Sequence, residues 1–597
     1  MNKSKIDGID FYAYFKSGAE EVKRNKEDLN RINVFPVRDG DTGTNLALTM
    51  HSIAEEATVS EEFNVVIKSM SNAAFENARG NSGIIFASFI NGFNNACGHL
   101  SSLTMEQFSH GANFAVNEAY AAVSTPVEGT MLTVIKEWAD YISNHYRSHK
   151  TFGELFEGAY QKAKQVLEDT PDMLEILKKN KVVDSGAKGF VFFLDGFNQV
   201  ISGIIHGNDQ SDKSKSSQPI ETIGHEDAFE TPNYRYCTEV LLYANIDQKN
   251  QIEDLMAGLG DSGIVTGNNN IVKIHVHTNT PAILTKRLIE SGFKVKKSKV
   301  DDMFIQSEVE SATKSKIAIL TDSIADVPEE VILKEQIHVV PLSLIADDSV
   351  YLDKLTATKD NIATILDYSQ VYPTSSQPEV KNVKAKLEWL LSLYDHVIII
   401  SVAKALSGTY ASYEKAVAEF ESEAERITLI DSKQNSGAQG LLVLEAVKMA
   451  NRGASVKDIV TKIQSDIPKT SIYVSLDTFK YAVQGGRVPN KIGNLLMKLN
   501  AKPIMSLDKE GNGTAFGLAF SRKAIDKKII KHVKKIIQTD GIDRYAIVHA
   551  NNPSLAERYQ SVFEELTGKS PVITTEISSI TTIHAGIGAV AIALTRR

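Results

Sequence analysis

One short stretch near the amino terminus combines acidic, hydroxyl and glycine residues in a spacing that suits metal and phosphate chemistry. In "RDGDTGTN" a glycine separates Asp39 from Asp41, and Thr42, Gly43 and Thr44 follow. Two carboxylates at positions i and i+2 of a tight turn can converge on a hard cation such as Mg²⁺, which prefers oxygen ligands. Hydroxyls and the N–H groups of a helix start can receive phosphate oxygens. A turn followed by an ordinary helix N-cap has the same residue types, so both interpretations stay open.

Three further small-residue turns precede apolar helical runs in the first third of the chain. They are "ARGNSG" at 78–83, "TPVEGTMLT" at 125–133 and "VVDSGAKG" at 182–189, the last of which carries Asp184. No G-x-x-x-x-G-K-[ST] sequence occurs, which excludes a Walker-type nucleotide site. Four such turns at the helix ends of one domain favour a shared ligand site over four separate connectors.

In this order and spacing, the four turns resemble the nucleotide-binding domain of bacterial dihydroxyacetone kinases. They resemble still more closely the ATP-binding subunit of bacterial fatty acid kinase, over roughly residues 8–205. The resemblance implies an eight-helix barrel that binds ATP through two Mg²⁺ ions, with Asp39 and Asp41 as metal ligands and catalytic residues. The residues implied to line the nucleotide site are Asn33, Thr42, Thr44, Asn45, Asn81, Ser82, Gly83, Thr130 and Asp184. Asn33 stands where the dihydroxyacetone enzymes have a third aspartate.

A cysteine and two histidines in the middle of the chain form a second candidate metal site. "YCTEV" supplies Cys237, and "KIHVHT" supplies His275 and His277, which share one face if the segment is a strand. Such a trio suits zinc, although a small buried cysteine beside two strand histidines explains it equally well. Residues 234–304 resemble the middle domain of the same ATP-binding protein, and the resemblance implies a structural zinc site at these three positions.

Hydroxyl-rich turns recur in the last half of the chain. "TDSIADVP", "YPTSSQPEV" and "ALSGTYASY" adjoin predicted strands or helices, where they could bind an anion or serve as ordinary caps and turns. Near the carboxyl terminus, "TIHAGIGAVAIAL" places Gly586, Gly588 and Ala591 in a G-x-G-x-x-A pattern. The βαβ completion of a dinucleotide site is missing, so we expect a glycine-opened helix that could hold an anion beside His584.

Together with "TLIDSK", "GGRV" and "FSRKA", these stretches resemble the DegV family of fatty-acid-binding proteins over about residues 316–597. The resemblance implies one acyl chain held between two α/β subdomains. The residues implied to hold the fatty carboxylate are Ser375, Ser376, Ser407, Gly408 and Thr409. Arg522 and His584 match a basic pair near the point of phosphoryl transfer, so we expect them to be catalytic. Ala585 and Ile587 replace the threonine and proline that usually follow this histidine.

Several domains must position these residues, because a chain of 597 residues is too long to fold around a single hydrophobic core. Residues 1–206 repeat apolar positions at three- and four-residue spacing, which predicts an all-α domain. Residues 207–233 are rich in Ser, Asp and Lys and predict a linker. Residues 234–313 predict a small α/β domain. Residues 314–597 alternate strand-like runs, such as "HVVPLSLI" and "HVIIISVA", with helical ones, and predict an α/β domain with ligands beyond its strand ends.

Composition narrows the class of protein. The chain is 42% hydrophobic and 23% charged with a net charge of -9, and no Lys/Arg stripe with interleaved aromatics suggests a nucleic-acid surface. Two cysteines, Cys97 and Cys237, form no disulfide framework, which fits a reducing compartment. No signal-type core and no apolar run of about 20 residues occurs. We therefore expect a cytoplasmic protein without an integral membrane segment.

The two resemblances together predict an ATP-dependent fatty acid kinase that makes acyl phosphate and ADP within one polypeptide. A fatty carboxylate is ionised at neutral pH, so it needs no general base. Burial of a sixteen-carbon tail is worth roughly 12 kcal/mol, which calls for a dedicated slot. Expected partners are a fatty acid, a second copy of the chain, transient contact with a membrane and a downstream acyl-phosphate acyltransferase. The alternatives are a lipid-binding sensor with a regulatory ATP domain and a dihydroxyacetone-type kinase of a small molecule.

Overall fold

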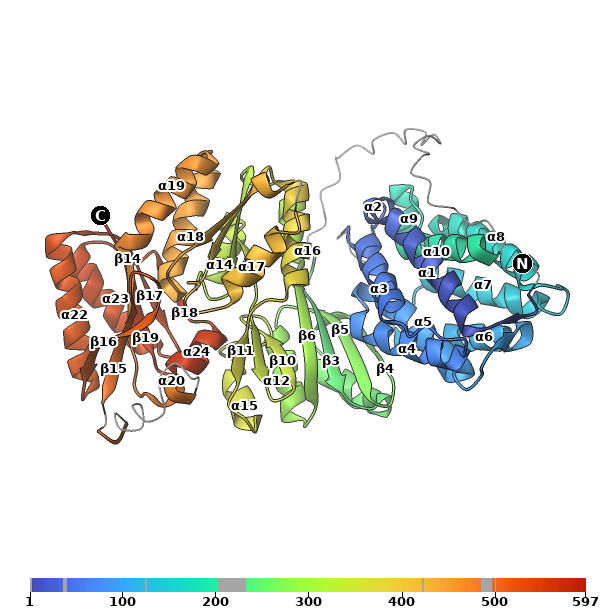
Figure 1. Cartoon of the computed structure of the whole chain (residues 1–597), viewed down its shortest axis with the longest axis horizontal. Coiled ribbons are helices and arrows are strands. Elements are labelled where there is room, and N and C mark those ends of the chain that lie inside the picture. The colour runs from blue at the N-terminus through green and yellow to red at the C-terminus, as the bar shows by residue number, and fades with distance from the viewer. Residues whose placement is uncertain are drawn as a thin grey trace. The chain divides into compact units, whose positions relative to one another are not determined.

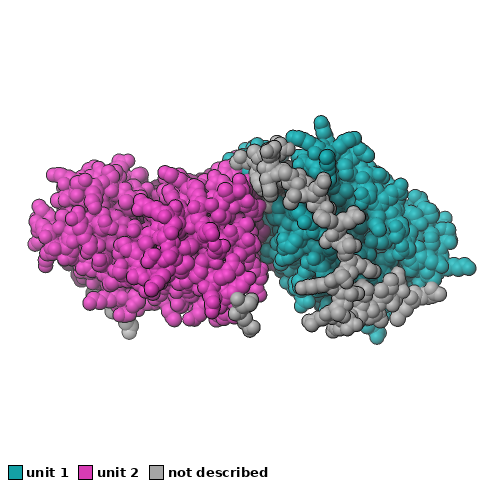
Figure 2. Space-filling model, turned by 90° about the horizontal axis from the view of Figure 1, so that it is seen from above, with its two compact units in different colours: residues 1–279 teal, residues 280–597 magenta. Residues whose placement is uncertain are grey.

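The computed structural model describes residues 3–35, 40–123, 126–201, 232–420, 423–484, 497–499 and 501–597. It divides into two compact units, residues 1–279 and 280–597, which Figure 2 distinguishes by colour. The division falls inside the middle domain expected from the sequence, so that domain contributes elements to both units.

The first unit is built mainly from helices (Figure 1). Their bounds are α1 (Gly8–Arg24), α2 (Lys26–Arg31), α3 (Thr42–Glu56), α4 (Phe63–Asn77), α5 (Gly80–Cys97), α6 (Met105–Ala122), α7 (Met131–His145), α8 (Phe152–Met173), α9 (Glu175–Asn180) and α10 (Ser185–Ile201). Within the described residues, the eight helices of 15 or more residues contact one another in a closed order. That order runs α1–α3–α4–α5–α6–α7–α8–α10 and returns to α1. A two-stranded ladder of β1 (Lys5–Ile6) and β2 (Leu103–Thr104) joins the chain start to α6.

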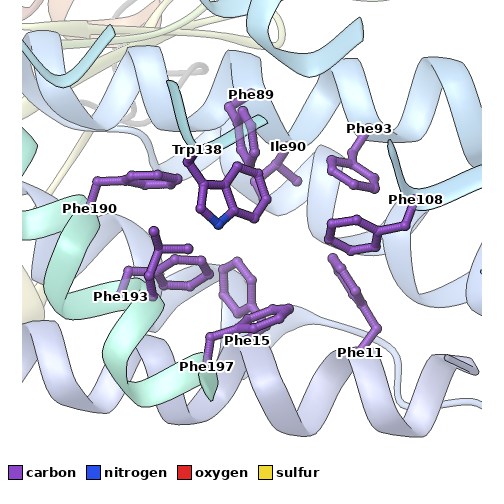
Figure 3. A pocket seen from close by; sticks show the side chains of 11 residues that line it. Phe11, Phe15, Phe89, Ile90, Phe93, Phe108, Trp138, Phe190, Phe193 and Phe197 are labelled. Atoms are coloured by element: carbon purple, nitrogen blue, oxygen red, sulfur yellow. The ribbon is translucent and has the colours of Figure 1, made fainter. Parts of the chain in front are cut away.

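Aromatic side chains fill the space that these helices enclose (Figure 3). The rings of Phe11, Phe93 and Phe108 pack edge to face or tilted with their neighbours, as do those of Trp138 and Phe190. The cavity that remains among them has a volume of about 20 Å³ and an apolar lining. A space of this size and polarity suits neither a nucleotide nor an acyl chain. The interior of the helical ring is therefore core, and a ligand site must lie at the helix ends.

A set of three antiparallel strands completes the first unit. It consists of β3 (Tyr236–Tyr243), β5 (Ile271–Thr278) and β4 (Gly260–Gly267), with η1 (Ile246–Gln248) and α11 (Lys249–Met256) in the connection. Ile264 of β4 joins the helical core, and the hydroxyl groups of Thr266 and Ser88 hydrogen-bond at 2.8 Å. These buried contacts anchor the sheet on α5.

The second unit contains three sheets and the helices around them (Figure 1). Its strands are β6 (Lys294–Asp302), β7 (Ile317–Asp322), β8 (His338–Val340), β9 (Ser343–Ala346), β10 (Ser349–Leu352), β11 (Thr374–Ser376), β12 (His396–Ser401), β13 (Ile427–Asp431), β14 (Thr470–Ser475), β15 (Lys502–Leu507), β16 (Gly513–Ala519), β17 (Ile542–His549), β18 (Ile573–Glu576) and β19 (Val590–Arg596). Strands β13-β12-β7-β8 form a parallel sheet, and β16-β15-β14-β19-β17-β18 form a mixed one. Strands β11-β9-β10 are antiparallel, and β10 pairs in parallel with β6.

The helices of the second unit cover these sheets. They are α12 (Pro281–Glu290), α13 (Met303–Ser311), α14 (Glu329–Glu335), α15 (Ile362–Tyr368), α16 (Val380–Leu393), α17 (Thr409–Val417), α18 (Ser436–Asn451), α19 (Val456–Asp466), α20 (Lys480–Gln484), α22 (Arg522–Thr539), α23 (Pro553–Thr567) and α24 (Ser579–Ala585), with short helical turns at Ala424–Arg426 and Ile467–Lys469. Helix α18 is apolar around most of its circumference, because its core neighbours come from both the parallel and the mixed sheet. It therefore binds the two subdomains of this unit to each other.

The structure confirms the helical character of the first part of the chain and the α/β character of the last part. Two local expectations are wrong. "HVVPLSLI" is two strands, β8 and β9, which belong to different sheets. The segment after Gly586 is strand β19 and not a helix, since paired β-branched residues place it between β14 and β17. In the described part of the chain, no helix has the length and apolar character needed to cross a bilayer.

Candidate functional site

The starts of α3 and α5 lie against each other. A Cβ on Gly80 would meet the side-chain nitrogen of Asn45 at 2.6 Å, and Gly80 has a φ of +60°, which favours glycine. The hydroxyl oxygen of Thr49 accepts a hydrogen bond from the N–H of Arg79 at 3.0 Å. The same oxygen lies 2.6 Å from the position of a Cβ on Gly83. The small residues of "ARGNSG" thus allow close approach between two helices, and this brings the predicted residues Asn45, Ser82 and Gly83 to one place.

The starts of α7 and α10 reach the same place. A Cβ on Gly186 would lie 3.0 Å from the hydroxyl oxygen of Ser82 and 3.3 Å from the Cβ of Met131. The buried carboxylate of Asp184 accepts hydrogen bonds from the N–H groups of Ala187, at 2.8 Å, and Met131. Burial raises the pKa of Asp184 to about 6, and these two hydrogen bonds oppose the rise. Asp184 therefore caps α10 and fastens it to α7, which is a structural role within the predicted site.

Three of the four converging helices, α3, α5 and α7, are not capped by their own N-cap side chains. Among the described residues, the N-cap side chains of α3, α5 and α7, which are Asp41, Arg79 and Thr130, accept no hydrogen bond from their own helices. The hydroxyl of Thr130 instead donates to the carbonyl oxygen of Val127 at 2.7 Å. By contrast, α1, α6 and α8 of the same unit have side-chain caps. Side chains of other segments accept one hydrogen bond from each of these first turns: Asn30 from the N–H of Thr44, Glu239 from that of Gly80 and Asp184 from that of Met131. The remaining N–H groups and the positive end of each helix dipole are suited to bind an anion.

The structure locates most of the predicted nucleotide residues at this junction, and one lies outside its description. Asp39 belongs to residues 36–39, which the structure does not describe. Asp41 and Thr42 open α3, and the hydroxyl of Thr44 accepts a hydrogen bond from the amide of Asn30 at 2.9 Å. Asn33 is almost fully buried just after α2. The side-chain oxygen of Asn81 is buried and has no hydrogen-bond partner among the described residues.

Cys237, His275 and His277 lie together on β3 and β5. Cys237 stands opposite His277 in the strand register, and the sulfur of Cys237 lies 3.9 Å from Nδ1 of His275. The three ligand atoms all lie within 4.8 Å of one another. Burial lowers the pKa of His277, although Asp261, 3.4 Å from its Nδ1, favours the protonated form. A thiol and two imidazoles at this spacing match the ligands that zinc takes in proteins.

The second unit brings together the two predicted carboxylate-binding stretches. Ser375 and Ser376 belong to β11, and Ser407 precedes α17. A Cβ on Gly408 would lie 1.8 Å from the side-chain oxygen of Gln377, so the two stretches are in contact at this point. The hydroxyl oxygens of Ser407 and Thr409 lie 2.8 Å apart. The end of the β11 stretch thus lies against the start of α17, where the hydroxyls of Ser407 and Thr409 stand beside the N-cap residue Gly408.

The predicted basic pair flanks the loop between α24 and β19. The guanidinium of Arg522 pairs with Asp477 at 2.9 Å and donates to the carbonyl oxygen of Gly588 at 3.4 Å. Asn552 donates to the same carbonyl oxygen at 2.9 Å. His584 lies in the last turn of α24, directly before this loop. Gly586 and Gly588 have φ values of +91° and +95°, so the glycines shape a loop and do not open a helix.

Family models match three consecutive parts of the chain. A DAK2 domain matches residues 36–199, the FakA-like middle domain of fatty acid kinases matches residues 233–310, and the DegV family matches residues 316–597. The uncharacterised protein MG369 of Mycoplasma genitalium is 30% identical over 64% of this chain and 73% of its own length. The chain belongs to the FakA-like fatty acid kinase family, with a DegV domain fused to it.

Other similar proteins match a smaller part of this chain. The uncharacterised protein SSP1546 of Staphylococcus saprophyticus is 34% identical over 47% of this chain, and the chain spans about half of that protein, 52%. Among solved structures, one from Thermus thermophilus is described as fatty acid binding of a DegV family protein. It is 25% identical with a TM-score of 0.43, and the match covers 47% of this chain and 99% of that one. SAG1342 of Streptococcus agalactiae, a fatty acid binding DegV family protein, is 26% identical with a TM-score of 0.42, over 47% and 99%.

Several residues that position the second site were missed from the sequence. The hydroxyl of Tyr372 donates to the carbonyl oxygen of Ile583 at 2.5 Å and so joins the segment before β11 to α24. The carboxylate of Asp326 accepts from the N–H of Ser578, and that of Asp353 accepts from the N–H of Ser579. These bonds hold the start of the helix that carries His584. Asp353 and Tyr372 stand outside the quoted stretches or at their edge, and only the fold brings them to α24.

The stretch "TDSIADVP" uses its polar groups internally. Asp322 and Ser323 are fully buried. The carboxylate of Asp322 accepts from the N–H of Val402 at 2.8 Å, and the hydroxyl of Ser323 donates to Asp353 at 2.6 Å. Of the two interpretations left open by the sequence, the structure favours a buried hydrogen-bond network over a ligand-binding turn.

Proposed function

We propose that this chain is an ATP-dependent fatty acid kinase, which transfers the γ-phosphoryl group of ATP to a fatty carboxylate. The observation that carries the proposal is the convergence of three helix starts that their own N-cap side chains do not cap, in a family member that also carries a DegV domain. The helical part of the first unit offers a place for phosphates, and the DegV domain offers hydroxyl groups for a carboxylate.

The nucleotide half of the proposal places ATP at the ends of the helical ring. The ring of eight long helices is proposed to be the nucleotide-binding barrel, with its aromatic interior serving only as core. Asn45, Ser82 and the first-turn N–H groups of α5 and α7 that Glu239 and Asp184 do not hold would line the phosphates. Asp39 and Asp41 would hold Mg²⁺, and the fact that Asp41 does not cap α3 fits this role. When bound, magnesium supplies positive charge that offsets the negative charge of the phosphates.

The acyl half of the proposal places the fatty carboxylate at the start of α17. The paired hydroxyls of Ser407 and Thr409 and the strand hydroxyls of Ser375 and Ser376 can donate to its oxygens. The hydroxyl oxygen of Ser407 accepts a hydrogen bond from the first N–H of α17, that of Thr409, at 3.2 Å, so the first turn adds its remaining N–H groups and the positive end of a helix dipole. The tail would be buried between the two α/β subdomains that α18 joins.

Charge is the main barrier to the reaction, because an anionic carboxylate must approach an anionic triphosphate. The nucleophile is already ionised and needs no base. Arg522 and His584 would stabilise the transferred group, with Asp477 and Gly588 orienting the guanidinium. Transfer requires the two sites to meet, either within one chain or between the two copies of a homodimer. The acyl phosphate would pass to a downstream acyltransferase.

Cys237, His275 and His277 are proposed to hold a structural zinc ion. Zinc would cross-link β3 to β5 by joining Cys237 to His275 and His277. The cluster belongs to the first unit and the acyl-binding hydroxyls to the second, and no catalytic role is proposed for it.

The proposal is tested with the full chain and Mg-ATP, with and without oleate or palmitate. Release of ADP that depends on the fatty acid, together with hydroxamate formation in hydroxylamine, supports the proposal. Asp41→Asn and Ser407→Ala should each reduce both signals at least tenfold. The matched controls are Asp169→Asn and Ser465→Ala, exposed residues of α8 and α19, which should leave both signals unchanged.

Two results would overturn it. ATP hydrolysis that is indifferent to fatty acid but stimulated by a small hydroxylated compound would favour a dihydroxyacetone-type kinase. Stable binding of a fatty acid without any ADP release would favour a lipid sensor with a regulatory ATP domain.

A further inference from the structure

A buried ion pair links strands β3 and β5 to the turn between α4 and α5. Glu239 of β3 and Lys273 of β5 lie 3.0 Å apart, from a carboxylate oxygen to the ammonium nitrogen, and each side chain is 5% exposed. Both come from the segment that follows residue 231, whereas the turn they contact is at residues 78–80. Figure 1 shows these strands beside α4 and α5.

Each member of the pair holds one end of this turn. The carboxylate of Glu239 accepts a hydrogen bond from the N–H of Gly80, the first residue of α5, at 2.8 Å. The ammonium group of Lys273 donates to the carbonyl oxygen of Ala78, the C-cap of α4. A carboxylate therefore meets a helix start and an ammonium group meets a helix end, the arrangement that helix dipoles favour. Inside the unit, Thr49 holds the remaining residue of the turn through the N–H of Arg79.

Stability alone gives little reason for such a pair. Taking two charges out of water costs several kcal/mol per ion, and a well-packed apolar pair of similar volume is often as stable. What the charges supply is a fixed position for the backbone of "ARGNSG", which carries Asn81, Ser82 and Gly83. The ammonium group also neutralises the carboxylate, so that the start of α5 stays attractive to an anion.

We propose that Glu239 and Lys273 are positioning residues of the nucleotide site, through which the sheet of the middle domain sets the phosphate-binding turn. The inference rests on the proposed ATP site. Glu239 fixes the first N–H of α5, and Lys273 both fixes the end of α4 and prevents the carboxylate from repelling phosphates. The DAK2 region by itself, residues 36–199, lacks both side chains, so its turn would be incomplete.

The proposal predicts an order of effects. Lys273→Met leaves an uncompensated carboxylate beside the site and should weaken binding of a non-hydrolysable ATP analogue at least about tenfold. Glu239→Gln keeps an oxygen for the N–H of Gly80 and should change the Kd by no more than about threefold. The double variant lacks both charges and should lie between the single variants. Because the cause is electrostatic, the loss for Lys273→Met should be larger for the ATP analogue than for adenosine.

Isothermal titration of the full chain measures these constants, and Trp138 fluorescence reports whether the first unit is folded. The matched control is Lys162→Met, which breaks the half-exposed pair of Lys162 with Glu137 at 3.1 Å between α8 and α7. It should bind the analogue like the wild type. If Lys273→Met does not fold, the double variant tests the proposal in its place. The proposal then requires the double variant to bind the ATP analogue several-fold more weakly than Glu239→Gln does.

Three outcomes would overturn the inference: equal binding by Lys273→Met and Lys162→Met, a loss that is the same for adenosine and the ATP analogue, or a double variant that binds like the wild type. Failure of the wild type itself to bind the analogue is a different result, since it refutes the proposed ATP site.

Discussion

The close contact between α2 and α3 makes Gly43 the most sensitive position for testing the geometry of the first site. A Cβ on Gly43 would lie 2.1 Å from the carbonyl oxygen of Lys26 and 2.7 Å from the Cβ of Leu29. Neither atom can rotate aside, so the first turn of α3 would have to move away from α2. We predict that Gly43→Ala destabilises the first unit and displaces Asp41 and Thr42.

The size of the effect can be worked out from the contacts that are lost. Overpacking of a tight site costs about 1–3 kcal/mol. Movement of α3 also breaks the two hydrogen bonds between Asn30 and Thr44, at 2.9 and 3.0 Å, which are worth about 1 kcal/mol each. Alanine regains about 1 kcal/mol through its higher helix propensity. The net loss in the free energy of unfolding is therefore about 2–4 kcal/mol.

Urea unfolding of the full chain measures this loss. The protein has two tryptophans, and in a Trp389→Phe background the fluorescence of Trp138 reports only the first unit. The matched control is Gly153→Ala. Gly153 is also the second residue of its helix, α8, but a Cβ there would meet its nearest neighbour, Ile201, at 3.6 Å, an ordinary contact. The control should gain about 0.5–1 kcal/mol.

The reasoning would be refuted if Gly43→Ala unfolded at the same or a higher urea concentration than its parent, with an unchanged slope. A destabilised Gly43→Ala protein that bound the ATP analogue with unchanged affinity would refute only the link between this turn and the nucleotide.

Three further predictions concern metal, pH and the acyl site. Cys237→Ser should reduce the zinc bound per purified chain, measured with a colorimetric chelator; Cys97→Ser should not, since burial raises the pKa of the Cys97 thiol to about 11 and it lies outside the cluster. Burial raises the pKa of Asp322 to about 6, so the folded state binds a proton more tightly than the unfolded chain, and this stability is present at low pH and lost as the pH rises through 6. The free energy of unfolding of the wild type minus that of Asp322→Asn, followed by Trp389 fluorescence, should thus fall by about 1.4 kcal/mol from pH 5 to 7.5, and a flat or rising difference would contradict it. Tyr372→Phe loses its bond to Ile583 and should lower kcat at least threefold with unchanged fatty acid affinity, measured by ADP release, whereas an unchanged kcat would show that this link does not position His584.

Local patterns in the sequence were sufficient to predict many of the helices and strands of both units. The three- and four-residue apolar spacing of "FNVVIKSMSNAAF" predicts a helix because one face must be buried, and α4 follows it. "IVKIHVHT" predicts a strand on which His275 and His277 share a face, and β5 places them beside Cys237. Small-residue turns likewise mark the starts of α3, α5, α7 and α10, since only small residues permit close helix approach.

Local patterns failed where pairing or burial between distant segments decides the outcome. "HVVPLSLI" reads as one strand, but its two halves pair with β7 and β10, in different sheets. The glycines near the carboxyl terminus predict a helix start. The residues that follow these glycines instead form strand β19, which pairs with β14 and β17. Nothing near "TDSIADVP" indicates that its carboxylates and hydroxyls are fully buried.

The sequence by itself determined which residue types could do chemistry and on which element each of them lies, because turn chemistry and apolar spacing are local properties. Only the tertiary structure decided which of these groups are available to a ligand. Asp184 is committed to capping α10 and Asp322 to a buried network, whereas the N-cap side chains of α3, α5 and α7 make no hydrogen bond to their own helices. The role of Glu239 and Lys273 was equally invisible, since the backbone groups they hold lie more than 150 residues away. Packing sets the hydrogen bonds and the burial between distant segments. It depends on residues from several parts of the chain, so no single stretch of sequence predicts it.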